Sequence, residues 1–567
     1  MTSQGLRASP EGIRAAKTAL TDKTLSQHKL AMALGITRQP VSKFFAGEPV
    51  SRSCFVQICQ NLGLSWQKVA GLEDNVSFES TTKVQSNGID LDTIVREVRQ
   101  KRQDKIQDQC NTVQMLDIAQ AIPLVDAYTP VRVLEEITSQ QWQEVSDLLK
   151  YFHWNSNFER LQKSNHHREL SGLEAVSRYS KLMVLGKVGS GKTTFLQYLA
   201  IECNQGRLQP NHAAIFIRLK EFAEDTKDNG ELNLFKYISQ EFVCCEIKEE
   251  LTATILAGGK ALILLDGLDE VPSTEADRVI REIRRFSQVY YKNNFIVSCR
   301  IAAHKYKFPG FTEVEVADFN FQQVETFVKN WFVAVAHQSP KQGEATSDLF
   351  IQQLNLPQNC LIQELAMTPI LLHLMCIAFQ FNAKFPSKPF KLYEQALDIL
   401  LIRWDEIKGV KRDKFGYNLN LKNIRNLLYK IAAITFEQKD YFFEKEMIQQ
   451  LIVEYLETLP NMNQDVVKLE VDSEFLLKIL EVEYGLLVER ARGIYSFSHV
   501  SLQEYLTAKN IVENYQDKNW AILSTYIGDE RWQNVFFFIV SMLLKSDGIL
   551  RLTKQKIDSL VADDKVS

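Results

Sequence analysis

The sequence lacks long apolar runs. Its longest uncharged apolar stretches, Pro369 to Phe379 and Val535 to Leu544, are much shorter than the roughly 20 residues of a membrane-spanning helix. The start of the chain also lacks the apolar segment of a secretory signal. We therefore expect a cytoplasmic protein that has no membrane partner.

Cysteine and proline are scarce as well. The 567 residues include 9 cysteines and 14 prolines, and no two cysteines form a C-x-x-C pair. The cysteines lie mostly in apolar segments, which favours reduced core thiols over a disulfide framework or a zinc site. With 45% hydrophobic and 24% charged residues, the composition predicts an ordinary globular chain, and its length predicts several domains.

Acidic residues are scarce at the N-terminal end. Residues 1–72 hold 9 Lys/Arg and 3 Asp/Glu, a net charge of +6, so the rest of the chain carries −10 of the total −4. A basic segment on an acidic body is compatible with a polyanionic partner, although a segment of this charge is more often simply soluble.

This basic segment has the spacing of a helix-turn-helix. Residues 24–33 favour a short helix, Gly35 supplies a flexible turn, and a second helix is expected to start near Arg38. The pattern resembles the phage-repressor class of helix-turn-helix domains, whose second helix enters the major groove of DNA. The resemblance implies DNA contacts from Thr37, Arg38, Gln39, Ser42 and Lys43. The alternative is a module that docks on a protein or recruits an effector.

The rest of the chain changes character twice. Residues 73–90 are polar and predict a tether, and a long amphipathic helix is expected from Leu91 to Gln109. Strand-like apolar runs at 182–185, 213–217, 261–265 and 295–299 then alternate with helical stretches, which is typical of an α/β fold with a parallel sheet. Beyond about residue 320 helical periodicity dominates, apart from a small β-hairpin expected at 485–498.

A glycine-rich loop follows the first apolar run. Residues 186–193 match G-x-x-x-x-G-K-[ST] and lie between that run and a predicted helix. Glycines let the backbone N–H groups curve around a phosphate, Lys192 neutralises its oxygens, and Thr193 offers a hydroxyl to Mg²⁺. The candidate nucleotide-binding residues of the loop are Gly186, Gly189, Ser190, Gly191, Lys192, Thr193 and Thr194.

Charged residues follow two later runs. Asp266 ends the run at 261–265, and its carboxylate is expected to hold Mg²⁺ together with Thr193. Asp269 and Glu270 come next and are candidates for polarising an attacking water. Arg300 follows the run at 295–299. It can sense a γ-phosphate if its strand lies between those at 182–185 and 261–265. The alternative is a surface salt bridge.

Over residues 110–510 these motifs together resemble a NACHT module, the nucleotide switch of the STAND class of signal-transducing NTPases. The segments LAMTPILLHLMC and FSHVSLQEYLTA are further marks of the resemblance. It implies that ATP or ADP binds with Mg²⁺ and that Pro369 lies against the adenine. It also implies that His499, in a winged-helix domain, reaches the β-phosphate of ADP and holds a closed resting form.

The expected fold class is multidomain. An α/β P-loop NTPase core with a parallel sheet is followed by helical and winged-helix domains and preceded by a small all-α domain. The expected domains are 1–72 helix-turn-helix, 73–125 linker and amphipathic helix, 126–318 NACHT, 319–410 helical, 411–510 winged helix and 511–567 helical tail.

The resemblance implies a slowly hydrolysing switch in which exchange of ADP for ATP opens the chain and lets copies associate. Bacterial members of the group resemble immune proteins, which suggests anti-phage defence; the sequence does not indicate the trigger. Two alternatives remain, a nucleotide-gated transcription regulator and a motor-like ATPase.

Overall fold

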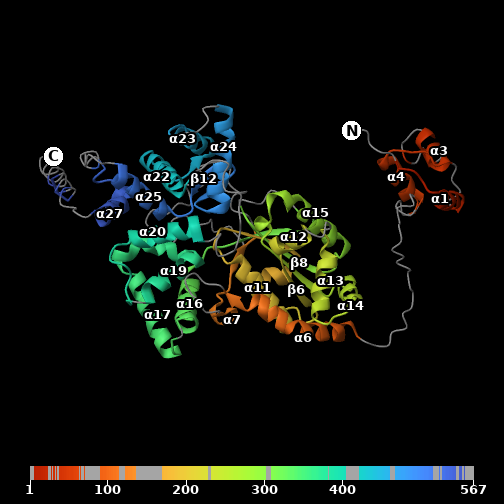
Figure 1. Cartoon of the computed structure of the whole chain (residues 1–567), viewed down its shortest axis with the longest axis horizontal. Coiled ribbons are helices and arrows are strands. Elements are labelled where there is room, and N and C mark those ends of the chain that lie inside the picture. The colour runs from red at the N-terminus through yellow and green to blue at the C-terminus, as the bar shows by residue number, and fades with distance from the viewer. Residues whose placement is uncertain are drawn as a thin grey trace. The chain divides into compact units, whose positions relative to one another are not determined.

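The structure is a computed structural model (Figure 1), and it divides the chain into two compact units, Met1–Ile89 and Asp90–Ser567. It describes residues 6–22, 27, 30, 31, 34, 38–62, 64, 69, 90–113, 122–135, 169–227, 232–301, 308–336, 338–380, 382–403, 420–459, 466–514, 523, 526–543, 548, 550, 551, 554, 555 and 558. Each unit is described by itself.

The N-terminal unit has a small helical core. Its helices are α1 (Pro10–Asp22), α3 (Arg38–Ala46) and α4 (Arg52–Leu62). The fully buried rings of Phe44 and Phe55 lie 4.9 Å apart at its centre. The predicted second helix does begin at Arg38, and Pro40 lies in its first turn, where a proline is tolerated. Most of the helix expected over 24–33, and the turn at 35–37, fall outside the described residues.

The second unit begins with the predicted amphipathic helix, α6 (Leu91–Cys110). Asp90 caps it by accepting the backbone N–H of Asp92. Val95, Val98 and Ile106 are buried along one side of the helix, at the spacing that an amphipathic helix needs.

A seven-stranded sheet in the order β4-β3-β9-β5-β8-β7-β6 forms the centre of this unit. Its strands are β3 (Arg132–Leu134), β4 (Glu169–Ser171), β5 (Lys181–Gly186), β6 (Ala213–Arg218), β7 (Ala261–Asp266), β8 (Asn294–Arg300) and β9 (Thr312–Val316). All four predicted runs are parallel strands, and β8 lies between β5 and β7. The sheet is not wholly parallel, however, because β3 and β4 run antiparallel at one edge.

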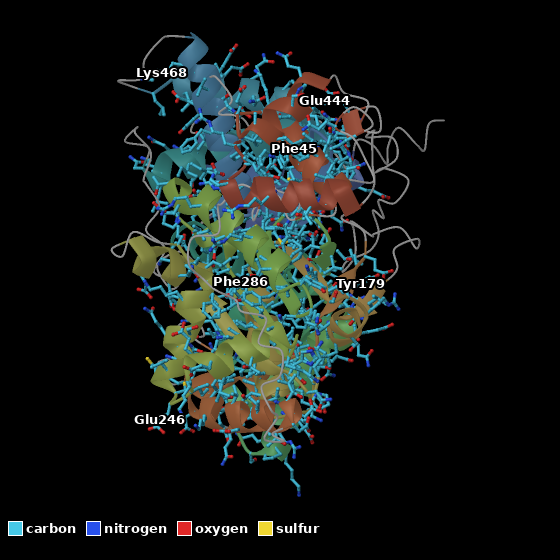
Figure 2. All side chains as sticks on the ribbon, turned by 90° about the vertical axis from the view of Figure 1, so that its right-hand side faces the viewer. Phe45, Tyr179, Glu246, Phe286, Glu444 and Lys468 are labelled. Carbon is cyan, nitrogen blue, oxygen red and sulfur yellow. The ribbon has the colours of Figure 1, made fainter. Side chains whose placement is uncertain are left out.

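Helices cover both faces of the sheet (Figure 1). α11 (Lys192–Asn204) packs Phe195 and Leu199 against the face that carries Leu182 and Val184. The opposite face is covered by α12 (Leu219–Lys227), α13 (Leu234–Cys244), α14 (Glu249–Ala257) and α15 (Ser273–Val289). Figure 2 labels Phe286 of α15, which is buried there.

Helices dominate after the sheet, as predicted. They include α16 (Phe321–Asn330), α17 (Pro340–Leu354), α19 (Pro369–Gln380), α20 (Phe390–Asp398), α22 (Leu421–Glu437), α23 (Lys445–Glu457), α24 (Val466–Lys478), α25 (Val500–Asn514) and α27 (Gln533–Met542). The predicted hairpin is present as β11 (Leu487–Ala491) and β12 (Ile494–Phe497), to which β10 (Phe443–Glu444) pairs.

One hydrophobic cluster joins these helices into a single body. It contains residues from Phe319 to Ile539, together with Ala127 and Val188, so the helical region and the hairpin region share a core. The expected boundary at residue 510 lies inside α25, and α27 packs on that helix through Phe538 and Tyr505. Among the described residues, no helix is long and apolar enough to cross a membrane.

Candidate nucleotide-binding site

The glycine-rich loop between β5 and α11 depends on glycine at two positions. Gly189 and Gly191 have φ angles of 71° and 89°, in the left-handed region that other residues avoid. A Cβ atom on Gly189 would lie 2.3 Å from the side chain of Ile370 in α19. Gly191 immediately precedes α11, so the first N–H groups of that helix face the loop.

Two lysines of the loop are held in different ways. Lys192 Nζ donates to the carbonyl oxygens of Gly186 and Lys187, at 2.8 Å each, and so folds back over the loop. Lys187 Nζ instead pairs with Asp318 Oδ2 at 2.6 Å, outside the loop. A bound phosphate would compete with the two neutral carbonyl oxygens for Lys192. The anionic phosphate is the better partner for this cation.

The predicted magnesium ligands lie together. Asp266 is buried at the end of β7, and its Oδ1 accepts hydrogen bonds from Thr193 Oγ1 at 3.3 Å and Ser298 Oγ at 2.6 Å. A carboxylate beside a hydroxyl is an oxygen donor set that suits Mg²⁺. The sequence prediction missed Ser298, which precedes Arg300 by two residues and therefore faces the same side of β8.

Asp269 and Arg300 form a buried ion pair. Arg300 Nε lies 2.8 Å from Asp269 Oδ2, and the backbone N–H of Arg300 donates to Oδ1 at 3.0 Å. The pair is nearly inaccessible to solvent, unlike the surface salt bridge that was the alternative for Arg300. Arg300 Nη1 also donates to the carbonyl oxygens of Val482 and Glu483, in the π-helical turn η6 (Ile479–Glu483).

Glu270 follows Asp269 at the end of the same turn, η1 (Leu268–Glu270). Its carboxylate folds over Gly267, where a Cβ atom would lie 3.0 Å from Glu270 Oε2. Both acids that follow Asp266 line a cavity, but Arg300 binds the carboxylate of Asp269, whereas the carboxylate of Glu270 lies near Gly267.

That cavity, called the polar cavity below, is lined mostly by polar and charged residues and has a volume of about 70 Å³. Its lining residues are Val188, Gly189, Ser190, Gly191, Lys192, Thr193, Thr194, Gly267, Asp269, Glu270, Ser298 and Arg300. The structure thus brings the predicted loop, the acids and Arg300 to one place. Ser190 Oγ is buried in the loop without a hydrogen-bond partner, so the loop has an unmet polar group.

A second cavity of about 140 Å³ is mostly apolar. Its lining residues are Ala127, Tyr128, Thr129, Val131, Gly189, Ser190, Gly191, Thr194, Phe319, Phe327, Pro369, Ile370 and His373. Both cavities share the glycine-rich loop. The hydroxyl of Thr129 is buried in the apolar cavity without a hydrogen-bond partner, and no sequence pattern pointed to it. These two cavities together fit a ligand with two different ends. A mostly apolar end that can also form hydrogen bonds fits the apolar cavity, and an anionic end fits the polar cavity.

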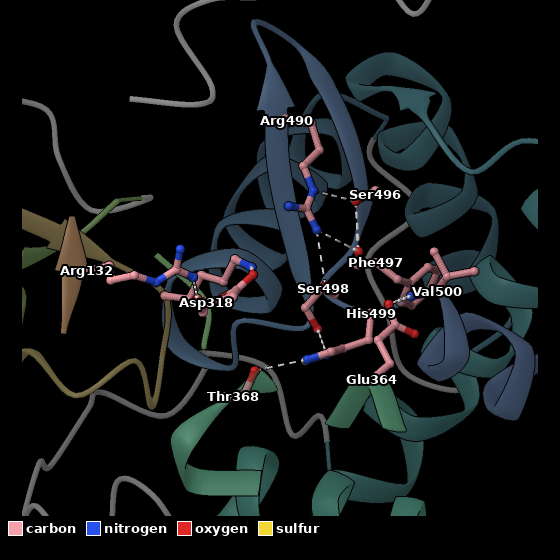
Figure 3. Close-up of polar contacts among 11 residues, drawn as sticks. Arg132, Asp318, Glu364, Thr368, Arg490, Ser496, Phe497, Ser498, His499 and Val500 are labelled. Carbon is pink, nitrogen blue, oxygen red and sulfur yellow. Dashed lines mark hydrogen bonds and ion pairs between the residues drawn. The ribbon is translucent and has the colours of Figure 1, made fainter. Parts of the chain in front are cut away.

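His499 and Pro369 meet through the residue that precedes the proline. His499 Nε2 lies 3.1 Å from Thr368 Oγ1, and His499 Nδ1 lies 3.1 Å from Ser498 Oγ (Figure 3). Burial lowers the pKa of His499; the charge of Glu364 opposes this shift, and that of Lys187 adds to it. The ring is therefore neutral at pH 7, and both of its nitrogens face a hydroxyl group. His499 lines neither of the two cavities.

The candidate DNA-binding residues are separated from this site in the chain. Gln39 and Lys43 are exposed on α3, and Ser42 is half-buried there. Arg38 is the first residue of the helix, and Thr37 falls outside the described residues.

Comparison with known families agrees with this geometry. Residues 180–334 match the model of the NACHT domain, and residues 390–511 match that of the winged helix-turn-helix domain C-terminal to NACHT. The chain carries a NACHT domain. The glycine-rich loop, Asp266 and Arg300 lie within its matched range, and His499 lies within that of the winged helix. Among curated proteins, none matches the chain in sequence.

Solved structures show more distant likenesses to the chain. Domain III of the Thermotoga maritima replication initiation protein DnaA is 16% identical, with a TM-score of 0.25, over 42% of this chain and 90% of that one. The ORC2 protein of Aeropyrum pernix is 11% identical, with a TM-score of 0.31, over 69% and 94%. A STAND protein with a tetratricopeptide repeat sensor, from Pyrococcus horikoshii, is 15% identical, with a TM-score of 0.21, over 69% and 50%. Similarities this weak carry no argument about function.

Proposed function

We propose that the chain is an adenine-nucleotide switch that binds ATP or ADP with Mg²⁺, hydrolyses ATP slowly, and opens and self-associates when ATP replaces ADP. The membership of residues 180–334 in the NACHT domain supports a nucleotide-dependent switch. The observation that carries the finer proposal is the pair of cavities, one apolar and one polar, that meet at the glycine-rich loop.

The nucleotide occupies both cavities in this proposal. Its base lies against Pro369 with the Thr129 hydroxyl within the same cavity, and its phosphates lie against the loop. Lys192 leaves the two loop carbonyls to neutralise the phosphate oxygens. Thr193 and Asp266 would hold Mg²⁺, which supplies further charge neutralisation.

We assign Glu270 to orienting the attacking water, because both acids line the polar cavity but the carboxylate of Asp269 is bound by Arg300. In this assignment Asp269 acts indirectly, by holding the guanidinium of Arg300 at the end of β8. Both acids support hydrolysis, whereas Asp266 supports binding as well.

The closed form is held by contacts between the winged helix and the nucleotide site. Arg300 donates to two carbonyl oxygens of η6, and Gly485 packs so closely that a Cβ atom would lie 2.9 Å from Val188. A γ-phosphate would attract Arg300 away from neutral carbonyls. We propose that this competition, together with the loss of a His499 contact to ADP, releases the winged helix.

The measurement of assembly tests this proposal. Mass photometry of the full chain should show larger species with a non-hydrolysable ATP analogue than with ADP. Glu270→Gln protein should assemble with ATP itself, because the variant does not hydrolyse the bound ATP and the γ-phosphate stays in place. Equal mass distributions with both nucleotides would contradict a switch that assembles.

The biological setting that we propose, bacterial anti-phage defence, rests on the NACHT resemblance alone. Cells that express the chain should form fewer phage plaques than cells that express Lys192→Ala. Equal plaque counts over a broad phage panel would contradict it.

A nucleotide-gated DNA-binding regulator is the second candidate function. It is favoured by α3, which buries Val41 and Phe44 and exposes Gln39 and Lys43 in a segment of net charge +6. DNA binding by the full chain should weaken steeply with salt, and Lys43→Ala should reduce the slope of log affinity against log salt by about one. Absence of duplex binding at low salt, with and without ATP, would favour the protein-docking alternative.

A further inference from the structure

His499 lies between the end of a strand and the start of a helix. β12 ends at Phe497 and α25 begins at Val500, so the histidine belongs to neither element. The backbone on each side of it must be fixed if its ring is to keep one direction. Two buried charged side chains, from different parts of the chain, bind these two flanks (Figure 3).

Arg490 of β11 holds the strand side. Its Nε donates to Ser496 Oγ at 2.9 Å, and its Nη2 donates to the carbonyl oxygens of Phe497 and Ser498 at 3.5 and 3.2 Å. One planar guanidinium thus binds three successive residues that lead directly to His499. The side chain is buried, so water does not compete for these bonds.

Glu364 holds the helix side. Its two carboxylate oxygens accept the backbone N–H groups of Val500 at 3.0 Å and Ser501 at 2.8 Å. These are the first N–H groups of α25, where the helix dipole favours a negative charge. Glu364 belongs to the short helical turn η4 (Glu364–Met367), which lies 136 residues earlier in the chain.

The same turn also reaches the histidine ring. Thr368 follows η4 directly; its hydroxyl contacts His499 Nε2, and its methyl group would lie 3.8 Å from a Cβ atom on Gly189 of the loop. The segment 364–368 therefore binds the helix start through Glu364 and the ring through Thr368, and it passes close to Gly189 of the nucleotide loop.

We infer that Glu364 and Arg490 are positioning residues that fix the direction of His499 toward the nucleotide phosphates. This inference rests on the proposed function, because it assumes that His499 contacts bound ADP. None of His499, Glu364 and Arg490 lines the two cavities. The two charged side chains bind the backbone on either side of the histidine, so we assign their effect to the placement of His499. Two buried charges are a costly way to hold a backbone that neutral caps could hold, which favours a directional role over simple stability.

The release of ADP tests this inference. Dissociation of a fluorescent ADP analogue would be measured for the full chain and for the variants His499→Ala and Glu364→Gln. The glutamine has nearly the size of the glutamate but cannot accept both N–H groups with its two terminal atoms. Glu282→Gln is a matched control, because Glu282 is also buried and accepts a helix-start N–H, from Leu234.

We expect His499→Ala to speed release about 10-fold or more and Glu364→Gln to speed it about 3- to 10-fold. The double variant His499→Ala/Glu364→Gln should release ADP at the rate of His499→Ala alone, because Glu364 acts through the histidine. Glu282→Gln should leave the rate unchanged. Arg490→Lys, which keeps the charge but loses the branched contacts, should behave as Glu364→Gln does.

Other outcomes separate the inference from the proposed function. If His499→Ala speeds release but both positioning variants do not, or if their effects add to that of His499→Ala, the positioning role is wrong. If His499→Ala itself leaves release unchanged, the proposed contact with ADP is wrong. A loss of folding in Glu364→Gln, measured by thermal unfolding, would contradict a directional role unless Arg490→Lys shows the predicted non-additive effect.

Discussion

At the scale of the residue, the end of β7 and the turn after it place three carboxylates in different surroundings. Asp266 is bound by hydroxyl groups, and Asp269 by the guanidinium of Arg300. Glu270 completes the polar cavity. Adjacent residues in the chain thus differ in their partners, which is what separate roles in binding and hydrolysis require.

Glu270→Gln should lower the rate of ATP hydrolysis about 100-fold or more, because a positioned carboxylate in general base catalysis contributes roughly 10²–10⁴-fold. ATP affinity should change little, since Lys192 and the loop remain. The measurement is phosphate release under saturating ATP, beside a binding titration. Glu275→Gln, on α15 outside the lining of the polar cavity, is the matched control; hydrolysis by Glu270→Gln at the parental rate would contradict the assignment.

At the scale of the element, the turn between η6 and β11 joins the winged helix to the loop. Gly485 has a φ angle of 61° and lies against Val188, whereas Gly493, with a φ angle of 72°, has no atom near its Cβ position. The two glycines therefore share a left-handed backbone conformation, which would strain a residue with a Cβ atom, but they differ in what surrounds them. This makes them a matched pair for testing the contact.

Gly485→Ala should open the closed form, because the added methyl group would collide with Val188. Gly493→Ala should cost a similar backbone strain, on the order of 1 kcal/mol, without loosening the contact. The measurement is ADP release and spontaneous assembly of both variants, after thermal unfolding shows that each is folded. Equal behaviour of the two variants would contradict a latch at this turn.

Glu481 in η6 makes the same element sensitive to pH. Burial raises the pKa of Glu481 to about 7, and the nearby Glu489 charge acts in the same direction. Tyr495 donates a hydrogen bond to it at 3.2 Å, and Lys445 opposes the shift. A raised folded-state pKa means that the protonated form stabilises the fold below the ordinary value of 4.5, and that this stability is lost as the pH rises through about 7.

Glu481→Gln should therefore remove a pH-dependent part of the free energy of unfolding. Relative to this variant, the parent should lose roughly 1–3 kcal/mol of its free energy of unfolding between pH 5 and pH 7.5. Denaturant unfolding at the two pH values measures it. A difference that does not depend on pH would show that Glu481 does not titrate in this range.

The elements also show what a sequence can predict. The runs at 182–185 and 261–265 were identified because buried parallel strands are continuously apolar. β9 was missed since Glu313 and Glu315 interrupt its apolar pattern, although Glu315 is buried in the structure. β3 and β4 have only three residues each, too few for any periodicity.

At the scale of the whole molecule, the sequence predicts local motifs but not the contacts between distant parts of the chain. The glycine-rich loop and the acids after β7 carry their chemistry in contiguous residues, so the sequence revealed them. The contact of Glu364 with Val500 joins residues 136 positions apart. Only the packing of the helical region against the winged helix creates it, and a resemblance to a family could indicate His499 but not the residues that hold it.

The central claim is that the two joined cavities hold an adenine nucleotide. The most direct test is chromatography of the nucleotide released from denatured, purified protein, compared between the parent and Lys192→Ala. We predict ADP or ATP in the parent and none in the variant. Lys192 lines the polar cavity and is the cation that the glycine-rich loop itself supplies to the phosphates. Unchanged occupancy in Lys192→Ala, or a non-adenine nucleotide in the parent, would contradict the account.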